Sequence, residues 1–495
     1  MSRIIAALLR HAVCDPLKVA LEDEYGTLTY GELLVEVEEL ASRLRACRPH
    51  AIAILADNGR DWALADLAAL VSGIPTIPIP LFFSPAQIAH TLKAAGVDHV
   101  LTDQPQRLGV ALQQPGLPVT PFYGALQQVH LQRGVAAATP LPAGTQKVTF
   151  TSGTTGEPKG VCLGLDAMET VAESLGVASA ASRDDRHLCL LPLATLLENI
   201  GGLYTPLLAG ATMCLPPVAA VGLSGSSGLD VGRLVGALGD WRASTAIMVP
   251  QMLQAVVAAG QAGATLPRTL RYLAVGGAPV PMRLLDNAHA LGLPVFQGYG
   301  LSECASVVAV SRPEASRNGS VGKPLPHVRI DFADDGEILV RGIPWHGYLG
   351  EDDDPQTPDF IATGDLGYLD AEGFLFLTGR KKNLFITSFG RNVAPEWVEG
   401  ELVVHPGIAQ AAIFGEARPF NCAVIVPHTG TPHGVIEAAL DTANRRLPDY
   451  ARVRAWIPAT EPFTPGNGMS TPNGRLRRTA ILGKYASEID ALYQP

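Results

Sequence analysis

The stretch from Phe150 to Gly160, FTSGTTGEPKG, gathers residue types that suit the binding of phosphate. It contains three glycines, three threonines, one serine and one lysine, and apolar runs typical of strands lie on both sides of it. Backbone amides, hydroxyl groups and a cation can all bind phosphate oxygens. No GxxxxGK[ST] spacing of a Walker A loop can be drawn through it. Alone, the stretch fits either a phosphate loop or a flexible connector, and other stretches must decide between them.

Five further short stretches accompany this loop along the chain. They are LTYGEL at 28–33, VGGAP at 275–279, QGYGLSE at 297–303, TGDLG at 363–367 and GRKKNLFITSFGRNVAP at 379–395. Together with SGTTGEPKG they resemble, in the same order, the motifs of the adenylate-forming (AMP-binding) superfamily of acyl-CoA synthetases, peptide-synthetase adenylation domains and luciferases. The later stretches are most similar to the long-chain fatty acyl-CoA synthetases.

The resemblance implies a two-step reaction. A carboxylate attacks the α-phosphate of ATP, pyrophosphate leaves, and the acyl-adenylate then meets a thiol. Catalysis of such transfers consists mostly of positioning and of neutralising charge. By this resemblance, the β- and γ-phosphates are held by the loop residues Thr151, Ser152, Gly153, Thr154, Thr155, Gly156 and Lys159.

The motif QGYGLSE implies contacts with the rest of the nucleotide. Tyr299, between Gly298 and Gly300, resembles the aromatic residue that stacks on adenine. Ser302 stands where the family usually has threonine, and either hydroxyl can meet the α-phosphate. Glu303 would hold Mg²⁺, which prefers carboxylate and phosphate oxygens. The turn that flanks the adenine and the acyl pocket is made of small residues, which let a backbone approach a flat ligand; these are Gly276, Gly277, Ala278 and Pro279.

The last two motifs imply a ribose site and a hinge. Asp365 resembles the carboxylate that takes both ribose hydroxyls, with Arg380 as its partner. Lys382 falls at the hinge about which the small domain swings between an adenylating and a thioester-forming pose. Gly390 matches the position whose missing side chain opens the pantetheine tunnel, and Phe389 stands where the long-chain branch commonly has a second glycine.

The segment LPLATLLENIGG (191–202) resembles a family segment but departs from it. Thr195 replaces a frequent histidine, so a role of that imidazole in gating or acyl positioning is in doubt. Glu198 and Asn199 are candidates for lining the site. Gly201 and Gly202 are expected to leave room for an acyl chain.

The largest departure lies in FTPGNGMSTPNGRLRRTAI (463–481), which resembles the segment that carries the family's catalytic lysine. The flanking PNG and LRR fix the register and place Arg475 at the lysine position. Arginine keeps the positive charge, but its planar fork has a different reach, so the exchange is not conservative. We therefore expect either a compensating cavity around the guanidinium or slow adenylation.

Composition narrows the class of protein. A chain of 495 residues, 47% hydrophobic and 17% charged, is globular and should divide into two or more domains. The net charge of -10 argues against nucleic-acid binding. Seven scattered cysteines without CxxC spacing predict reduced thiols in a cytoplasmic protein and suggest no zinc site.

The first apolar run is too short for a secretory leader. The uncharged windows 67–92 and 199–229 contain prolines, which predicts buried strand and loop rather than membrane spans.

The order of apolar runs predicts an α/β fold. From residue 51 onward, strands at 51–57, 74–79 and 98–103 alternate with helices at 61–73 and 84–96, which implies right-handed crossovers and a largely parallel sheet. Alternating residues and DG or EG turns after 325 predict hairpins. We expect a large domain, 1–379, of mixed but largely parallel sheets with flanking helices and a small β-barrel-like part. A small α+β domain, 380–495, should follow, and the resemblance implies that it is mobile.

The resemblance to the adenylate-forming superfamily implies an acid–thiol ligase that uses ATP, Mg²⁺ and coenzyme A, with a medium- or long-chain fatty acid as the favoured substrate. The first alternative acceptor is the pantetheine arm of an acyl carrier protein. The second alternative, prompted by Arg475, is a protein that binds nucleotide or acyl-adenylate with little turnover. No nucleic-acid partner and no transmembrane segment are expected, and a homodimer is compatible with the sequence.

Overall fold

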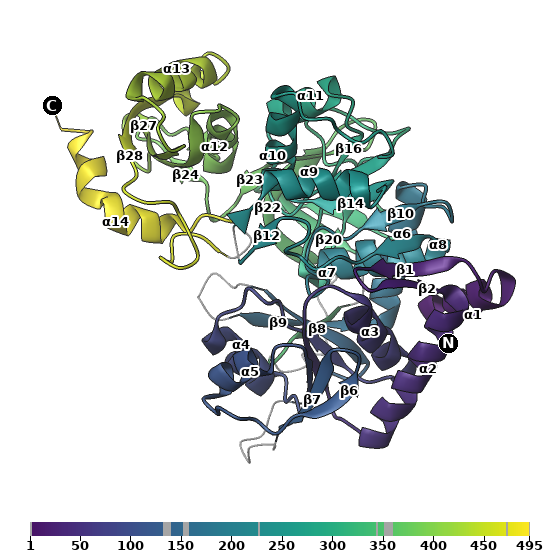
Figure 1. Ribbon diagram of the computed structural model, residues 1–495. Helices are drawn as coiled ribbons and strands as arrows, with labels where there is room; N and C mark the ends of the chain where they lie inside the picture. The colour runs from purple at the N-terminus through teal and green to yellow at the C-terminus, as the bar shows by residue number, and fades with distance from the viewer. Residues whose placement is uncertain are drawn as a thin grey trace.

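The computed structural model describes residues 2–131, 140–151, 158–225, 228–342, 345–350, 360–471 and 474–494. Figure 1 shows a larger lobe, purple to green, and a smaller lobe, light green to yellow, which contains α12, α13 and α14. The α/β fold predicted from the sequence is confirmed by two large mixed sheets with helices packed on them. Among the described residues, no helix combines the length and apolar character needed to cross a bilayer.

The first sheet has eight strands, and its four central strands are parallel. In spatial order they are β21 (Trp345–Tyr348), β9 (Lys159–Gly164), β8 (Thr145–Thr151), β4 (Thr76–Pro78), β3 (Ile52–Leu55), β5 (His99–Thr102), β7 (Leu126–His130) and β6 (Thr120–Tyr123). The predicted crossovers are present as α3 (Arg60–Ser72) and α4 (Pro85–Ala94). Ser84 caps α4 and forms a capping box with Gln87.

The second sheet has nine strands and is parallel except at its edges. In spatial order they are β18 (Lys323–Pro324), β17 (Ala309–Val310), β16 (Val295–Tyr299), β15 (Tyr272–Val275), β14 (Thr245–Met248), β10 (Arg186–Leu188), β11 (Thr212–Cys214), β1 (Val19–Asp23) and β2 (Gly26–Thr29). Because β15 and β16 are parallel neighbours, the turns VGGAP and QGYGLSE that follow them lie at the same edge of the sheet.

Helices cover both sheets of the larger lobe. They are α1 (Arg3–Cys14), α2 (Tyr30–Cys47), α5 (Pro105–Leu112), α6 (Leu165–Ala178), α7 (Leu196–Glu198), the π-helix η1 (Asn199–Tyr204), α8 (Thr205–Ala209), α9 (Val231–Asp240), α10 (Pro250–Gln261), α11 (Met282–Ala290) and the 3-10 turn η2 (Ser302–Cys304). A short hairpin, β12 (Leu223–Ser224) and β13 (Gly228–Leu229), precedes α9. The windows 67–92 and 199–229 therefore both contain helices as well as strand and loop, and the expectation of strand and loop alone is wrong for each.

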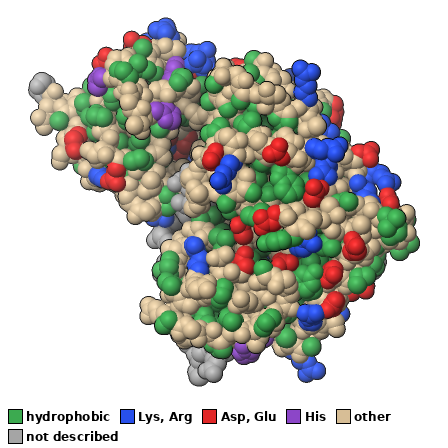
Figure 2. Space-filling model, viewed as in Figure 1, with side chains coloured by type: hydrophobic (Ala, Val, Ile, Leu, Met, Phe, Trp, Pro, Cys, Tyr) green, Lys and Arg blue, Asp and Glu red, His purple; other side chains and the backbone are tan. Residues whose placement is uncertain are grey.

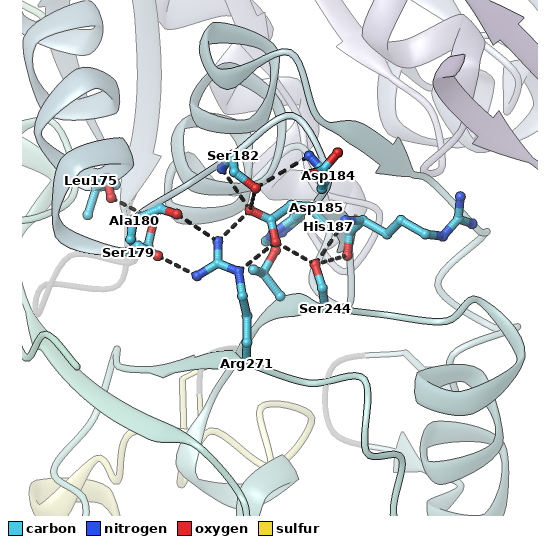
Figure 3. A network of polar contacts seen from close by, with 11 residues as sticks. Leu175, Ser179, Ala180, Ser182, Asp184, Asp185, His187, Ser244 and Arg271 are labelled. Carbon is cyan, nitrogen blue, oxygen red and sulfur yellow. Dashed lines mark hydrogen bonds and ion pairs between the residues drawn. The ribbon is translucent and has the colours of Figure 1, made fainter. Parts of the chain in front are cut away.

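One charged network closes the end of the second sheet where β10, β14 and β15 begin (Figure 3). Arg271 Nε donates to Asp185 Oδ1 at 2.6 Å, and its Nη1 donates to the Ser179 carbonyl at 2.6 Å. Ser244 Oγ donates to the same Asp185 oxygen at 2.7 Å. Although burial raises the pKa of Asp185, the hydrogen bonds from Arg271 and Ser244 outweigh it and lower that pKa. The network ties three neighbouring strands together, at the opposite end from the two turns above.

The hairpins predicted after residue 325 form a four-stranded antiparallel sheet. Its strands are β19 (Arg329–Phe332), β20 (Glu337–Arg341), β22 (Ile361–Leu369) and β23 (Leu375–Arg380), in that spatial order.

The smaller lobe begins just after this sheet. It consists of β24 (Phe385–Ile386), β25 (Asn392–Val393), α12 (Pro395–Val403), β26 (Ile408–Phe414), β27 (Asn421–Pro427), α13 (His433–Asn444), the 3-10 turn η3 (Asp449–Ala451), β28 (Val453–Pro458) and α14 (Arg478–Ala491). Phe385 already packs in the core of this lobe, whereas β23 ends at Arg380 in the preceding sheet. β23 thus runs one residue past the boundary at 379/380 that we expected, and that boundary stays a proposal.

Several contacts join the lobes in the described part of the chain, and three of them are polar contacts of named side chains. Gln254 Nε2 on α10 donates to the Val403 carbonyl at 2.5 Å, and Arg283 Nη1 lies 3.4 Å from His405 Nε2. Arg475 Nη2 donates to the Gly277 carbonyl at 3.1 Å. On the face in Figure 2, acidic and basic side chains are interspersed over the larger lobe.

Candidate active site

Tyr299 and Asp365 meet where β16 ends beside β22. The Tyr299 hydroxyl donates to Asp365 Oδ2 at 2.9 Å, and both side chains are buried. Burial, followed by the Asp365 carboxylate, raises the pKa of Tyr299, so the phenol stays protonated and acts as a donor. At Gly300, the next residue, an added Cβ would lie 1.8 Å from the Ser306 carbonyl oxygen. Only glycine therefore fits the turn that follows this tyrosine.

Arg380 holds the other side of Asp365. The two residues face each other in the ladder between β22 and β23, and Arg380 Nε donates to Asp365 Oδ1 at 2.6 Å. Thr363 Oγ1 accepts a hydrogen bond of 3.1 Å from the Asp365 amide. The carboxylate is thus oriented by an arginine and a tyrosine while it keeps lone pairs for a ligand.

Glu303 and Lys159 are linked through Tyr348. The Tyr348 hydroxyl donates to Glu303 Oε1 at 2.6 Å, and Lys159 Nζ lies 4.9 Å from the centre of the same ring. Lys159 pairs with Thr151 in the ladder between β8 and β9, so these two residues bracket the loop. The other expected phosphate-binding residues, Ser152, Gly153, Thr154, Thr155 and Gly156, lie outside the described residues. Ser302 adjoins Glu303 in η2.

Arg475 reaches this group from the smaller lobe. Its Nη2 donates to the Gly277 carbonyl at 3.1 Å, on the turn formed by Gly276, Gly277, Ala278 and Pro279. Gly277 has φ +84°, which favours glycine. Although Arg475 keeps solvent-exposed surface, desolvation by the surrounding protein and then the Arg380 charge lower its pKa, while Asp365 and Glu303 oppose that shift. The guanidinium therefore lies in the field of both carboxylates of the site.

The hinge and tunnel residues occupy separate places. Lys382 lies in an exposed turn directly after β23, and partial desolvation by neighbouring atoms, followed by the charges of Arg380 and Arg475, lowers its pKa. Gly390, with φ +71°, lies in the loop between β24 and β25, beside Phe389, whose side chain is 75% exposed. The described contacts bring together Tyr299, Asp365, Arg380, Glu303, Lys159 and Arg475, and they do not join Gly390 to that group.

The expectation that Gly201 and Gly202 leave open room is wrong. An added Cβ at Gly201 would lie 2.6 Å from Ile247 Cδ1, and one at Gly202 would lie 2.5 Å from Glu198 Oε1. Glu198 and Asn199 are themselves fully buried and face polar groups of the core. Thr195 Oγ1 donates to the Pro192 carbonyl at 2.7 Å, a local contact.

A buried polar network, which the sequence did not reveal, holds the π-helix η1. Lys147 Nζ donates to Asp66 Oδ1 at 2.6 Å, to Asn199 Oδ1 at 2.7 Å and to the Tyr204 hydroxyl at 2.9 Å. Tyr204 donates in turn to Asp66 Oδ2 at 2.5 Å. Lys147 belongs to β8, the strand that leads to the phosphate loop, so the network connects this strand to η1. The only sequence signal was a lysine within the short run that predicted this strand.

Comparison with known proteins gives two family matches. The family described as AMP-binding enzyme matches residues 8–349, and that described as AMP-binding enzyme C-terminal domain matches residues 382–495. The long-chain-fatty-acid–CoA ligase of Mycobacterium bovis is 35% identical over 258 residues, which cover 46% of this chain and 43% of that relative. That match thus spans less than half of the relative's length.

Longer matches have lower identity. The 2-succinylbenzoate–CoA ligase of Bacillus subtilis is 27% identical over 479 residues, 90% of each chain. The crystal structure of the anthranilate CoA ligase AuaEII in complex with anthranoyl-AMP is similar with a TM-score of 0.80 and 18% identity, and it covers 99% of this chain and 98% of the other. At this identity, the similarity shows a shared fold.

Proposed function

Because this chain belongs to the AMP-binding enzyme family, we propose that it is an ATP-dependent acid–thiol ligase. It joins a carboxylate to the AMP moiety of ATP with release of pyrophosphate, and the acyl group then passes to the sulfur of coenzyme A with release of AMP. The observation that carries the proposal is the convergence of Asp365, held by Tyr299 and Arg380, with Glu303 and with Arg475 from the smaller lobe.

The residues present fit a nucleotide and a magnesium ion. Asp365 has both oxygens oriented by donors and retains acceptor capacity for ribose hydroxyls. Glu303 carries a carboxylate held by Tyr348, a suitable oxygen ligand for Mg²⁺. Lys159 supplies a cation at the end of the phosphate loop, and Arg475 supplies one beside the turn at Gly277. When bound, the metal would neutralise phosphate charge.

For the acid, we propose a medium- or long-chain fatty acid first, supported by the match to a long-chain-fatty-acid–CoA ligase. A compact aromatic acid is the second candidate. It is supported by the similarity, over nearly the whole chain, to ligases whose names refer to succinylbenzoate and anthranilate. The side chains of Ile247 and Glu198 beside Gly201 and Gly202 also favour it, because they fill space that a long chain would need.

The acceptor is coenzyme A in this proposal, with an acyl carrier protein as the alternative. A panel of fatty and aromatic acids, assayed for pyrophosphate release with and without coenzyme A, tests both the proposed acid and the proposed acceptor. Release that depends on one class of acid identifies the substrate, and acyl-CoA formation identifies the acceptor. Tight ATP binding without pyrophosphate release for any acid would favour a binding protein with little turnover, the alternative prompted by Arg475.

A further inference from the structure

Three buried side chains of different chemistry meet beside the π-helix. They are His187 on β10, Cys189 just after this strand, and Glu198 at the end of α7. One donor atom from each lies within 4.8 Å of the other two, and the residues are 4%, 0% and 0% exposed. Among the described residues, this is the one group of three or more histidine, cysteine or acidic side chains that meets in this way.

Hydrogen bonds within the protein leave this group incompletely satisfied. His187 Nδ1 contacts Thr245 Oγ1 at 2.9 Å, and its Nε2 lies 3.2 Å from Glu198 Oε1. Glu198 Oε2 is buried without a hydrogen-bond partner in the described part of the chain. The Cys189 thiol lies 3.6 Å from the Gly202 carbonyl oxygen, and the Glu198 carboxylate is its other acceptor. A buried carboxylate in such surroundings is costly unless a positive charge compensates it.

The donor atoms also converge on one point. A Cβ added to Gly202 would lie 2.5 Å from Glu198 Oε1, 2.9 Å from His187 Nε2 and 3.1 Å from Cys189 Sγ. The three groups therefore surround the space in front of the Gly202 backbone. Any side chain at position 202 would push them apart, so glycine here preserves the cluster.

We propose that His187 Nε2, Cys189 Sγ and the Glu198 carboxylate bind a zinc ion, with the Gly202 carbonyl as the fourth ligand. Zinc prefers thiolate and imidazole ligands and tolerates a carboxylate, in a tetrahedral arrangement. Nitrogen and oxygen ligands at about 2.05 Å from a tetrahedral zinc ion are about 3.3 Å apart, and a sulfur and an oxygen ligand are about 3.6 Å apart. The observed separations are 3.2 Å for Nε2 to Oε1 and 3.6 Å for Sγ to the Gly202 oxygen.

Charge balance and ring orientation support the same ion. One thiolate and one carboxylate neutralise a divalent cation, so the loaded site carries no net charge in its buried surroundings. Thr245 Oγ1 at His187 Nδ1 supplies the outer hydrogen bond that commonly orients a metal-binding imidazole. The ion would close the chain between Cys189 and Glu198 into a loop and fix the start of η1. The spacing of the cysteines could not predict this site, because only one ligand is a cysteine.

The first test is the metal content of the purified, untagged full-length protein, expressed with added zinc and dialysed without strong chelators. We expect about one zinc per chain by elemental analysis. Cys189→Ser and Glu198→Gln should each lower the zinc content at least tenfold, whereas the matched control Cys422→Ser, a buried cysteine of the smaller lobe, should retain it. Equal zinc content in the folded wild type and in Cys189→Ser would overturn the proposal.

A second test needs no variant at the site. Protein produced in cobalt-supplemented medium should show the charge-transfer absorption of a cobalt–thiolate bond, with the d–d intensity of tetrahedral coordination. The Cys422→Ser control should give the same spectrum. Folded wild-type protein that takes up no cobalt, or takes it up without a thiolate band, contradicts the assignment even if the Cys189 and Glu198 variants fail to fold.

Discussion

The Tyr299 hydroxyl donates its hydrogen to Asp365 Oδ2 at 2.9 Å, so a hydrogen bond within the protein joins the expected adenine platform to the expected ribose acceptor. Arg380 holds Asp365 Oδ1. The proposed nucleotide site therefore has its main acceptor oriented in advance, which lowers the cost of ordering it upon binding.

Asp365→Ala should weaken ATP binding about 10- to 100-fold while the fold is kept, because unpaired ribose hydroxyls and an uncompensated Arg380 cost about 1–3 kcal/mol or more. Calorimetric titration with ATP measures this change. The matched variant Tyr299→Phe keeps the ring and loses only the hydroxyl, so its affinity should fall by less. Unchanged ATP affinity and adenylation rate in Asp365→Ala would refute the ribose assignment.

Lys382→Pro should separate the two half-reactions. Proline fixes φ near -65° at a turn that lies directly between β23 and the smaller lobe, and so restricts a swing about that point. We expect either adenylation or thioester formation to survive while the other collapses, and Lys382→Ala, which only removes the charge, to retain both. Pyrophosphate release and acyl-CoA formation are measured separately. An equal decrease of both rates in folded protein would show that Lys382 is not the pivot.

Arg475→Lys should raise the adenylation rate and leave thioester formation from supplied acyl-adenylate almost unchanged. The site already receives a cation here, since Arg475 Nη2 reaches the Gly277 carbonyl, but its broad fork differs in reach from a lysine. A well-placed group of this kind contributes about 3–4 kcal/mol to lowering a barrier. Arg475→Ala, which removes the charge, should slow adenylation more than 100-fold. Loss of adenylation in Arg475→Lys would instead identify the arginine as the working cation.

Asp185 should contribute to acid sensitivity. Its pKa is lowered in the folded state, so its stabilising effect is complete above the unfolded pKa of about 3.9 and is lost as the pH falls through the folded pKa. Asp185→Asn should lower the unfolding free energy by about 1–3 kcal/mol at pH 7, because Arg271 loses its partner. The stability of this variant should then fall less steeply than that of the wild type at pH values below about 4. Denaturant titrations from neutral to acid pH measure this, with exposed Asp184→Asn as the control. A slope equal to that of the wild type contradicts the assignment.

Local signals predicted much of the fold. Such signals depend on only a few neighbouring residues. Two examples are Ser84 and Pro85 at the start of α4 and the DG turn at Asp335 in the β19–β20 hairpin, and the structure contains both the helix and the hairpin. Contacts between distant segments could not be predicted in this way. Tyr348, which joins Glu303 to Lys159, is 45 residues from Glu303, and no motif marks it. The parallel strand β28 and the helix α14 were also missed. The pairing of β28 with β27 and the packing of α14 both depend on the fold of the smaller lobe.

The space beside Gly201 and Gly202 illustrates a second limit. Glycines in a motif segment predicted room, but Ile247 and Glu198 arrive from elsewhere in the chain and fill it. A missing side chain leaves a cavity only when no other residue packs there, and packing in a core is close to complete.

The network of Lys147, Asp66, Asn199 and Tyr204 has a consequence for how this sequence can vary. The three hydrogens of the ammonium group each have an acceptor, and both Asp66 oxygens are bound. Loss of any one member would leave a buried charge or polar group unpaired, at a cost of about 3–5 kcal/mol for the ion pair. Joint replacement by apolar side chains of similar volume can be nearly neutral. The four positions should therefore change together in related chains, all polar or all apolar, with mixed sets rare.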